Sequence, residues 1–382
     1  MVTSQGGGSL VHGWNIGDDG MMRTEEKLLL KILRSALWGN SLEGDISAKE
    51  FRHVMRLAIE QTVAGLVFDV LSAKTISVRQ QQLMDCIGMS MEIERLSRMA
   101  DKEVAEMARA FDAVGMDYLV VKGQTIACLY PKPLLRQSGD IDYLVRDDYC
   151  IARPLSERAL GVKLPEKMLE REVGFEKNGV PYELHTSLRT FASRKHQKAW
   201  DALMTKEWQE YHFVAINGQK VRVLSPTVLV AYVFIHLFFH IVREGVSLRQ
   251  LCDWTIVLHH YRDEVDRHRL LGIMDSLGMT EGFRAFGAIV VDELGLCPED
   301  FPVELSRGDR RWKEILLADI FAGGNFGKLH HKADSSWRFK METMRIAVRN
   351  SVKYRKLAPM EVGLLIPRLL RGNALVLMKK LF

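Results

Sequence analysis

The sequence can be organised around one heptapeptide, Gly139-Asp140-Ile141-Asp142-Tyr143-Leu144-Val145. Its apolar residues are typical of a strand, and they adjoin two aspartates, Asp140 and Asp142, that are two positions apart. On a strand, side chains at positions i and i+2 lie on the same face. Two carboxylates on one face attract hard cations, because Mg²⁺ prefers oxygen ligands. The stretch therefore predicts a strand that carries two metal ligands.

A third acidic residue, Glu183, extends this prediction. It lies in the second arm of a hairpin predicted from Asn178-Gly179, a strong hairpin signal between two runs of strand formers. If this arm pairs beside the strand of Asp140 and Asp142, the three carboxylates converge and can hold two Mg²⁺ or Mn²⁺ ions. These three residues are the predicted metal ligands and catalytic residues. Replacing Asp142 with Asn is expected to abolish turnover and to leave folding largely intact.

Residues that precede the Asp140–Asp142 strand predict a phosphate site. Tyr118 to Val121 reads as a strand, and Lys122-Gly123 then opens a short helical segment. A helix N-terminus binds phosphate through its free N–H groups, and the ammonium group of Lys122 adds positive charge. Arg136 could contact another phosphate, and Gly139 lets the backbone approach a ligand closely. The predicted ligand-binding residues are Lys122, Gly123, Arg136 and Gly139.

The strand signals are confined to the middle of the chain. Apolar residues recur at helical spacing before residue 114 and again after residue 225. We expect an α+β fold with a small mixed β-sheet core at residues 115–224, between helical regions at 22–114 and 225–382. Residues 1–21 are expected to form a disordered tail. The apolar stretch Val228 to Val242 is shorter than the ~20 residues of a membrane span, and it predicts a buried helix.

The composition of the 382 residues limits the class of protein. Hydrophobic residues make up 47% and charged residues 26%, as in a soluble globular protein. The net charge of +5 suits a polyanionic ligand without demanding one. The five cysteines include no CxxC pair, which argues against a disulfide framework or a zinc ribbon and suits a reducing compartment. Because no basic, apolar leader opens the sequence, we expect a cytoplasmic protein.

The motifs taken together resemble the uncharacterised bacterial nucleotidyltransferase family of the DNA polymerase β-like superfamily. The residues that carry the resemblance are Val120-Val121-Lys122-Gly123, Leu129-Tyr130-Pro131, Arg136, Gly139-Asp140-Ile141-Asp142-Tyr143-Leu144-Val145 and Tyr182-Glu183-Leu184-His185. The resemblance implies a small mixed sheet with flanking helices and metal ligands at Asp140, Asp142 and Glu183. It also implies transfer of a nucleoside monophosphate from an NTP, such as ATP, to an unknown hydroxyl acceptor with release of pyrophosphate.

One departure from the superfamily keeps other functions open. The first helix of the superfamily begins with Gly-Ser or Gly-Gly, whereas this chain has Gly123-Gln124 and lacks the hydroxyl that would contact a phosphate. A catalytically inactive nucleotide-binding module of the same fold is therefore an alternative. A toxin–antitoxin type of interaction protein is another. The acceptor could be a small molecule, a protein side chain or RNA.

Three histidines are given structural interpretations. His236 and His240 are four apart on an apolar helix without the Glu of a His-Glu-x-x-His site, so we expect satisfied core or cleft histidines. His185 is expected to face away from the metals and to form structural hydrogen bonds.

Three further signals have both an ordinary and a functional interpretation. Arg249 and Asp253 predict an i, i+4 ion pair on a helix, or a lining of the acceptor side of the cleft. Residues 323–328 lack the spacing of a phosphate loop and are read as a glycine-rich turn. The basic stretch 362–382 is expected to pack on the helical region, although an anionic membrane surface is an alternative.

Overall fold

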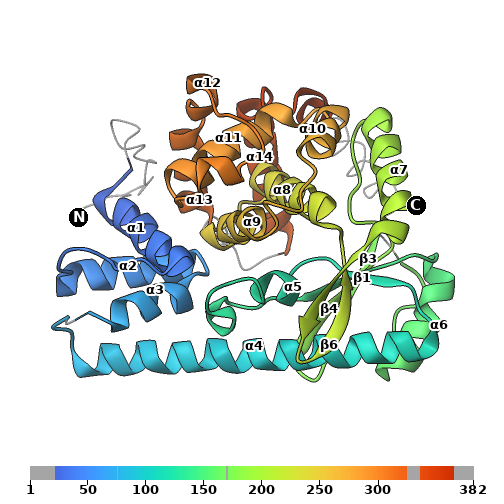
Figure 1. The fold of residues 1–382 in the computed structure, drawn as a ribbon, viewed down its shortest axis with the longest axis horizontal. Helices are drawn as coiled ribbons and strands as arrows, with labels where there is room; N and C mark the ends of the chain where they lie inside the picture. The colour runs from blue at the N-terminus through green and yellow to red at the C-terminus, as the bar shows by residue number, and fades with distance from the viewer. Residues whose placement is uncertain (1–21, 75, 169–170, 325–335, 365–382) are drawn as a thin grey trace, which may run out of the picture.

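A computed structural model describes residues 22–74, 76–168, 171–324 and 336–364 of the chain. The described part is an α+β fold in which one six-stranded mixed sheet lies among helices, as the sequence predicts (Figure 1). The predicted disordered tail lies outside the described residues. So do residues 325–328 of the glycine-rich turn and most of the basic C-terminal stretch.

The sheet has the strand order β3-β4-β2-β1-β6-β5. Its central strand, β2, pairs antiparallel with β1 and parallel with β4. Strand β1 also pairs parallel with β6, through Val120 and Val223, so the two ends of the sheet segment of the chain lie side by side. The bounds are β1 Tyr118–Val120, β2 Ile141–Val145, β3 Glu172–Lys177, β4 Val180–His185, β5 His212–Ile216 and β6 Gln219–Val223.

The hairpin predicted at Asn178-Gly179 is confirmed, and a second Asn-Gly hairpin lies at Asn217-Gly218. Asn178 and Gly179 connect β3 to β4 with φ values of 53° and 75°, and Asn217 and Gly218 connect β5 to β6 with 48° and 74°. A two-residue turn with positive φ at both positions matches the right-handed twist of the paired strands. Asn and Gly are the residues that adopt this conformation most readily, so these dipeptides fix the register of both hairpins.

One face of the sheet packs against the long helix α4, Gln80–Val114, and against α6, Tyr149–Leu160 (Figure 1). Alternation along β2 sends Ile141, Tyr143 and Val145 into this core, where Tyr143 lies 5.2 Å from the ring of Phe111. Asp142 lies between them in the sequence, and it therefore points to the opposite face. That opposite face is the one that carries the candidate site.

The helices on either side of the sheet region share a second core. N-terminal helices α1, Thr24–Trp38, α2, Ala48–Glu60, and α3, Ala64–Ser72, pack with the C-terminal helices and with the second face of the sheet. The remaining elements are α5 Gln124–Ala127, η1 Pro133–Leu135, α7 Arg194–Glu210, α8 Pro226–Arg243, α9 Leu248–His260, α10 Arg267–Ser276, α11 Thr280–Asp292, η2 Pro298–Asp300, α12 Arg307–Arg310, α13 Lys313–Gly323 and α14 Ser336–Lys353. The domain boundaries at residues 115 and 225 stay predictions.

Within the described residues, α8 is the one helix that is long and apolar enough to cross a membrane by length and composition. However, 78% of its 18 residues are buried inside the protein. Its aromatic residues Phe234 and Phe238 pack against α9 and α11, with Trp254 and Phe283 within 5.4 Å of the Phe234 ring. The predicted buried helix is confirmed, and its partly buried residue His236 lines a cavity beside the sheet region.

Candidate functional site

Strand register brings two of the three predicted carboxylates together. The parallel pairing of β2 with β4 sets Asp142 directly opposite Glu183, and Leu144 opposite His185. One ligand atom from each of Asp142, Glu183 and His185 lies within 4.8 Å of the other two. The Asp142 side chain is fully buried, whereas the Glu183 side chain is 35% exposed. Asp142 thus lies at the buried end of the cluster, and Glu183 is the carboxylate that an incoming ligand can reach.

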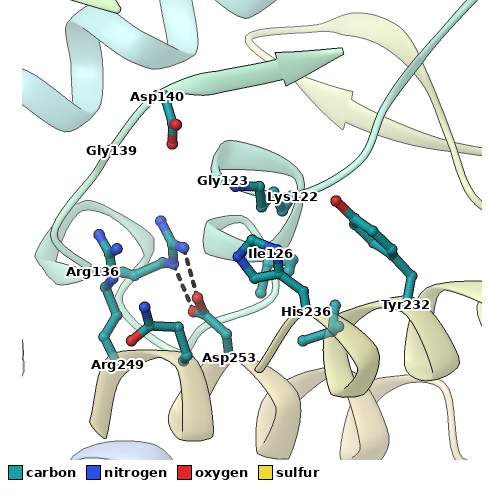
Figure 2. Close-up of a pocket in the computed structure, with 12 residues that line it drawn as sticks. Lys122, Gly123, Ile126, Arg136, Gly139, Asp140, Tyr232, His236, Arg249 and Asp253 are labelled. Atoms are coloured by element: carbon teal, nitrogen blue, oxygen red, sulfur yellow. Dashed lines mark hydrogen bonds and ion pairs between the residues drawn. The ribbon is translucent and has the colours of Figure 1, made fainter. Parts of the chain in front are cut away.

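Asp140 lies beside this cluster rather than within it. Strand β2 begins at Ile141, so Asp140 occupies the turn just before the strand. Its half-buried carboxylate lines a cavity together with Lys122 and points into that cavity in Figure 2. The structure therefore joins Asp142 and Glu183, and it places Asp140 on the neighbouring wall. The role of all three as metal ligands stays a prediction.

Two cationic side chains stabilise the negative charge of Asp142. Lys122 Nζ lies 2.9 Å from Oδ2, and His185 Nε2 lies 2.9 Å from Oδ1. Burial alone would raise the pKa of Asp142, but Lys122 and His185 outweigh it and lower that pKa below its ordinary value. Burial likewise opposes the charge of Lys122, and the carboxylates of Asp142 and Asp140 raise its pKa above the ordinary value. Asp142 is consequently ionised throughout the physiological range.

The expectation that His185 faces away from the site is wrong. His185 follows Glu183 by two positions on β4, so both side chains lie on the same face. Its Nε2 lies 3.5 Å from the Glu183 carboxylate, in addition to its bond with Asp142. Burial opposes protonation, but the hydrogen bonds to Asp142 and Glu183 raise the pKa of His185 to about 9. The i+2 spacing from Glu183 is the sequence signal that could have identified this residue.

The turn that contains Gly123 requires a glycine. Its φ is 70° and its ψ is −119°, and a Cβ at this position would lie 3.1 Å from the carbonyl oxygen of Asp140. The helix that follows, α5, has four residues, so its dipole adds little to phosphate binding. Gln124 turns away from the site, because its Nε2 donates to Ser97 O at 3.2 Å and to Asp101 at 2.5 Å on α4. Gln124, which stands where the superfamily has Ser or Gly, therefore anchors the turn to α4.

Arg136 is fully engaged by a carboxylate. Its guanidinium is buried and donates through Nε and Nη2 to the two carboxylate oxygens of Asp253 on α9, both at 2.7 Å (Figure 2). The hydroxyl of Tyr130 also donates to Asp253, at 2.8 Å. The predicted ion pair between Arg249 and Asp253 is wrong, because Arg136 occupies the carboxylate. Contact between Arg136 and a phosphate stays a prediction, and here its charge is already compensated.

A cavity adjoins the carboxylate cluster and separates the sheet region from α8 and α9 (Figure 2). Tyr232 and His236 from α8 face it, and burial followed by the charge of Lys122 lowers the pKa of His236 well below its ordinary value. His236 is therefore a neutral imidazole, as expected of a cleft histidine. The twelve lining residues are Lys122, Gly123, Ile126, Arg136, Gly139, Asp140, Tyr232, Val233, His236, Arg249, Gln250 and Asp253.

The site thus combines a sheet face that carries paired acidic residues with a neighbouring cavity of mixed charge. The chain belongs to a family described as uncharacterised nucleotidyltransferases, whose model matches residues 47–293. That match spans the sheet, the carboxylate cluster and the helices that wall the cavity.

Among solved structures, the chain is similar to an antigenic nucleotidyltransferase-like protein from Paracoccidioides brasiliensis. The two share 15% sequence identity, with 56% of this chain and 97% of the other covered at a TM-score of 0.29. A likeness this distant adds nothing to the assignment. No curated protein matches the chain.

Proposed function

We propose that this protein transfers a nucleoside monophosphate from an NTP, such as ATP, to a hydroxyl acceptor and releases pyrophosphate. Membership of the nucleotidyltransferase family supports the class of reaction. The observation that carries the proposal is the β2–β4 register, which sets Asp142 beside Glu183 and next to the cavity that Asp140 lines. The acceptor is a small molecule, a protein side chain or an RNA.

The donor atoms in the cluster fit a divalent metal. Oδ2 of Asp142 is buried, and among the described residues only the ammonium of Lys122 compensates it. Hard carboxylate oxygens are what Mg²⁺ and Mn²⁺ prefer, and Asp142, Glu183 and Asp140 would hold such ions. When bound, the metal neutralises phosphate charge and lowers the pKa of the attacking hydroxyl.

The residues around the cluster have separate roles in this proposal. His185 keeps Asp142 ionised and oriented through its 2.9 Å hydrogen bond. Lys122 exchanges its ion pair with Asp142 for a phosphate oxygen of the NTP, and Gly123 and Gly139 allow the backbone to come close to that phosphate. His236, a neutral imidazole facing the cavity, accepts a hydrogen bond from the acceptor hydroxyl and orients it, and the proton released on attack passes to water.

Glu183 is the best position for the decisive test. Asn at Asp142 would leave the Lys122 ammonium without its partner, and breaking a buried pair costs about 3–5 kcal/mol. The sequence-based expectation that this variant folds normally therefore needs revision. Glu183 is a third exposed, so Glu183→Gln should keep the free energy of unfolding within about 0.5 kcal/mol of the unchanged protein.

The test incubates the protein with each labelled NTP, Mg²⁺ and a cell lysate that supplies the acceptor, and measures label transfer and pyrophosphate. The unchanged protein should transfer label only when the metal is present, and Glu183→Gln should lower the rate by about 100-fold or more, as when a transition-state contact is lost. A matched control is Glu176→Gln, at an exposed position on β3. Equal rates for Glu183→Gln and the unchanged protein would refute the assignment.

A second candidate is a module that binds nucleotide without transferring it. The hydrogen bonds of Gln124 to α4 favour this second candidate. Gln124 stands where the superfamily has a serine hydroxyl or a glycine, and its side chain is directed to α4 and not to a phosphate. Calorimetry with ATP and Mg²⁺ beside a pyrophosphate assay separates the two, since a sensor binds ATP and releases no pyrophosphate.

We also propose that the protein is a bacterial member of the DNA polymerase β-like superfamily and works in the cytoplasm. The motif order around Asp140 and Asp142 supports the superfamily. All five cysteines are free thiols, which suits a reducing compartment.

A further inference from the structure

Arg249 is a cation that the fold leaves without a carboxylate. It lies in the first turn of α9 and is half-buried, and its Nη1 donates to the carbonyl oxygen of Gln137 at 2.9 Å. It forms no ion pair with any residue in the described part of the chain. Its Nε is buried and has no hydrogen-bond partner there either. A guanidinium group with this much unused capacity is suited to an anion from outside the protein.

Stability does not account for a cation at this position. The N-terminus of a helix carries partial positive charge, so an arginine in the first turn of α9 is electrostatically disfavoured. Asp253, one turn further along α9, would be the natural partner, but Arg136 occupies both of its oxygens. Burial, followed by the charge of Arg136, lowers the pKa of Arg249. The unliganded protein thus holds Arg249 at a cost in free energy.

A second buried donor lines the same cavity. Gln250 is 6% exposed, and its Oε1 accepts from the backbone N–H of Ser247 at 3.0 Å. Its Nε2 is buried and has no acceptor among the described residues. An unsatisfied buried donor typically costs about 1–3 kcal/mol. Arg249 Nε and Gln250 Nε2 are therefore two donors on residues lining the cavity that have no acceptor among the described residues.

The position of the cavity points to the chemical class of the anion. The Arg249 guanidinium lies against Gly139, because a Cβ on that glycine would lie 3.7 Å from Nη1. Asp140 and Lys122 line the same cavity, so an anion held there would be next to the proposed metal ligands. A guanidinium fork matches the oxygens of a phosphate and binds them with paired hydrogen bonds. The NTP of the proposed function brings such phosphate oxygens beside Asp140 as a polyphosphate.

We propose that this cavity is the subsite for the polyphosphate of the nucleotide, and that Arg249 is its anion-binding residue with Gln250 as a further donor. The inference rests on the proposed function, since it assumes that the nucleotide enters beside Asp140. It also assigns a binding role to α9, a helix outside the sheet. The same phosphate chemistry could belong to a phosphorylated acceptor, and the experiment separates the two sources.

The experiment titrates inorganic tripolyphosphate into the full chain by calorimetry in Mg²⁺. Arg249→Gln should weaken binding by about 10-fold or more, because a hydrogen bond to a charged group is worth about 1.5–3 kcal/mol. The tripolyphosphate affinity of Arg249→Lys should lie between that of the unchanged protein and that of Arg249→Gln. Arg52→Gln, at an exposed position on α2, is the matched control and should bind as the unchanged protein does. Unchanged tripolyphosphate affinity in Arg249→Gln would overturn the proposal.

Two further measurements keep the test decisive. The melting temperature of Arg249→Gln should equal or exceed that of the unchanged protein, because an uncompensated cation is removed; a purely structural arginine would lower it and leave tripolyphosphate affinity intact. Titration with inorganic phosphate alone tests the other source: weakened phosphate binding with normal tripolyphosphate binding would assign Arg249 to the acceptor and overturn the polyphosphate subsite.

The outcomes for the subsite and for the proposed function are distinguishable. If no NTP transfers label but Arg249→Gln still loses tripolyphosphate binding, the subsite stands and the transfer reaction fails. If label transfer occurs and Arg249→Gln keeps both its tripolyphosphate affinity and its KM for the NTP, the subsite alone fails.

Discussion

Asp142 is a buried carboxylate that needs compensation whether or not a ligand is present. Lys122 and His185 supply it from two sides, each at 2.9 Å. Lys122 lies against Oδ2, the oxygen that a metal would take in the proposed function, so the lysine and the metal would compete for one atom. Such competition would make the stability of the protein depend on whether metal is bound.

Lys122→Met tests that competition. Without metal, the variant leaves Asp142 short of a partner and should lose about 3–5 kcal/mol of unfolding free energy. Added Mg²⁺ should recover more of the melting temperature in the variant than in the unchanged protein, because ligand binding to the folded state stabilises it. Lys102→Met, on the exposed side of α4, is the control. An equal response of Lys122→Met and the unchanged protein to Mg²⁺ would contradict this interpretation.

The sequence placed Asp142 on a strand and Glu183 on a hairpin arm from local signals, and their meeting depended on an assumed pairing of the two strands, which the structure shows. It failed at His185, although the spacing Glu183-Leu184-His185 contained the answer. It could not pair Arg136 with Asp253, because the partners are 117 residues apart and nothing local to either indicates the other. Arg249 was consequently assigned the wrong partner. Side-chain periodicity is local, whereas ion-pair choice is set by packing.

At the scale of elements, the ion pair between Arg136 and Asp253 joins the segment after η1 to α9. Burial would raise the pKa of Asp253, but Arg136 outweighs it and lowers that pKa. A lowered folded-state pKa contributes stability that is complete above the unfolded value, about 4, and is lost as the pH falls through the folded value. The joint between these two elements is therefore sensitive to acid.

Asp253→Asn checks that sensitivity. The variant leaves Arg136 buried without its carboxylate and should lose about 3–5 kcal/mol of unfolding free energy at pH 7. The difference from the unchanged protein should stay constant between pH 7 and 5 and should narrow below about pH 4. Urea unfolding at several pH values measures it. A difference that persists undiminished to pH 3 would mean that Asp253 does not act through its charge.

The elements themselves were predictable where local chemistry is strong. Both Asn-Gly turns, the long helix α4 and the buried helix α8 follow from turn residues and apolar spacing. The strand order was beyond the sequence, because the parallel β1–β6 pair joins strands about a hundred residues apart and involves a single register pair, Val120 with Val223. Helix α8 begins at Pro226, directly after β6, so the β1–β6 pairing positions the helix that lines the cavity with α9.

Across the whole molecule, the N-terminal helices are joined directly to the C-terminal ones (Figure 1). Gln61 donates to the carbonyl oxygen of Ile320 at 3.1 Å and accepts from the backbone N–H of Leu248 at 3.0 Å. Thr62, whose φ of 54° is unusual for a β-branched residue, shares a 2.8 Å hydrogen bond with Ser247. The start of α9, where Arg249 lies, is thus held by residues from the other end of the chain.

Gln61→Ala should weaken this connection. The Leu248 N–H and the Ile320 carbonyl would lose their buried partner, at about 1–3 kcal/mol for an unsatisfied group. Urea unfolding should show the loss, and tripolyphosphate affinity should fall as the start of α9 loosens. Gln81→Ala, at an exposed position on α4, is the control and should change neither quantity. A normal unfolding free energy for Gln61→Ala would show that the hydrogen bonds of Gln61 do not help to hold the two ends together.

The bonds of Gln61 also bear on the order in which the chain is made. Helices α1 to α3 are synthesised long before the acceptors of Gln61, which lie 259 and 260 residues further along at Ile320 and Phe321. During that interval the apolar sides of these helices have no finished surface to cover them. A growing chain should therefore depend on chaperones until residues 320 and 321 have emerged, and should become resistant to proteases only after that.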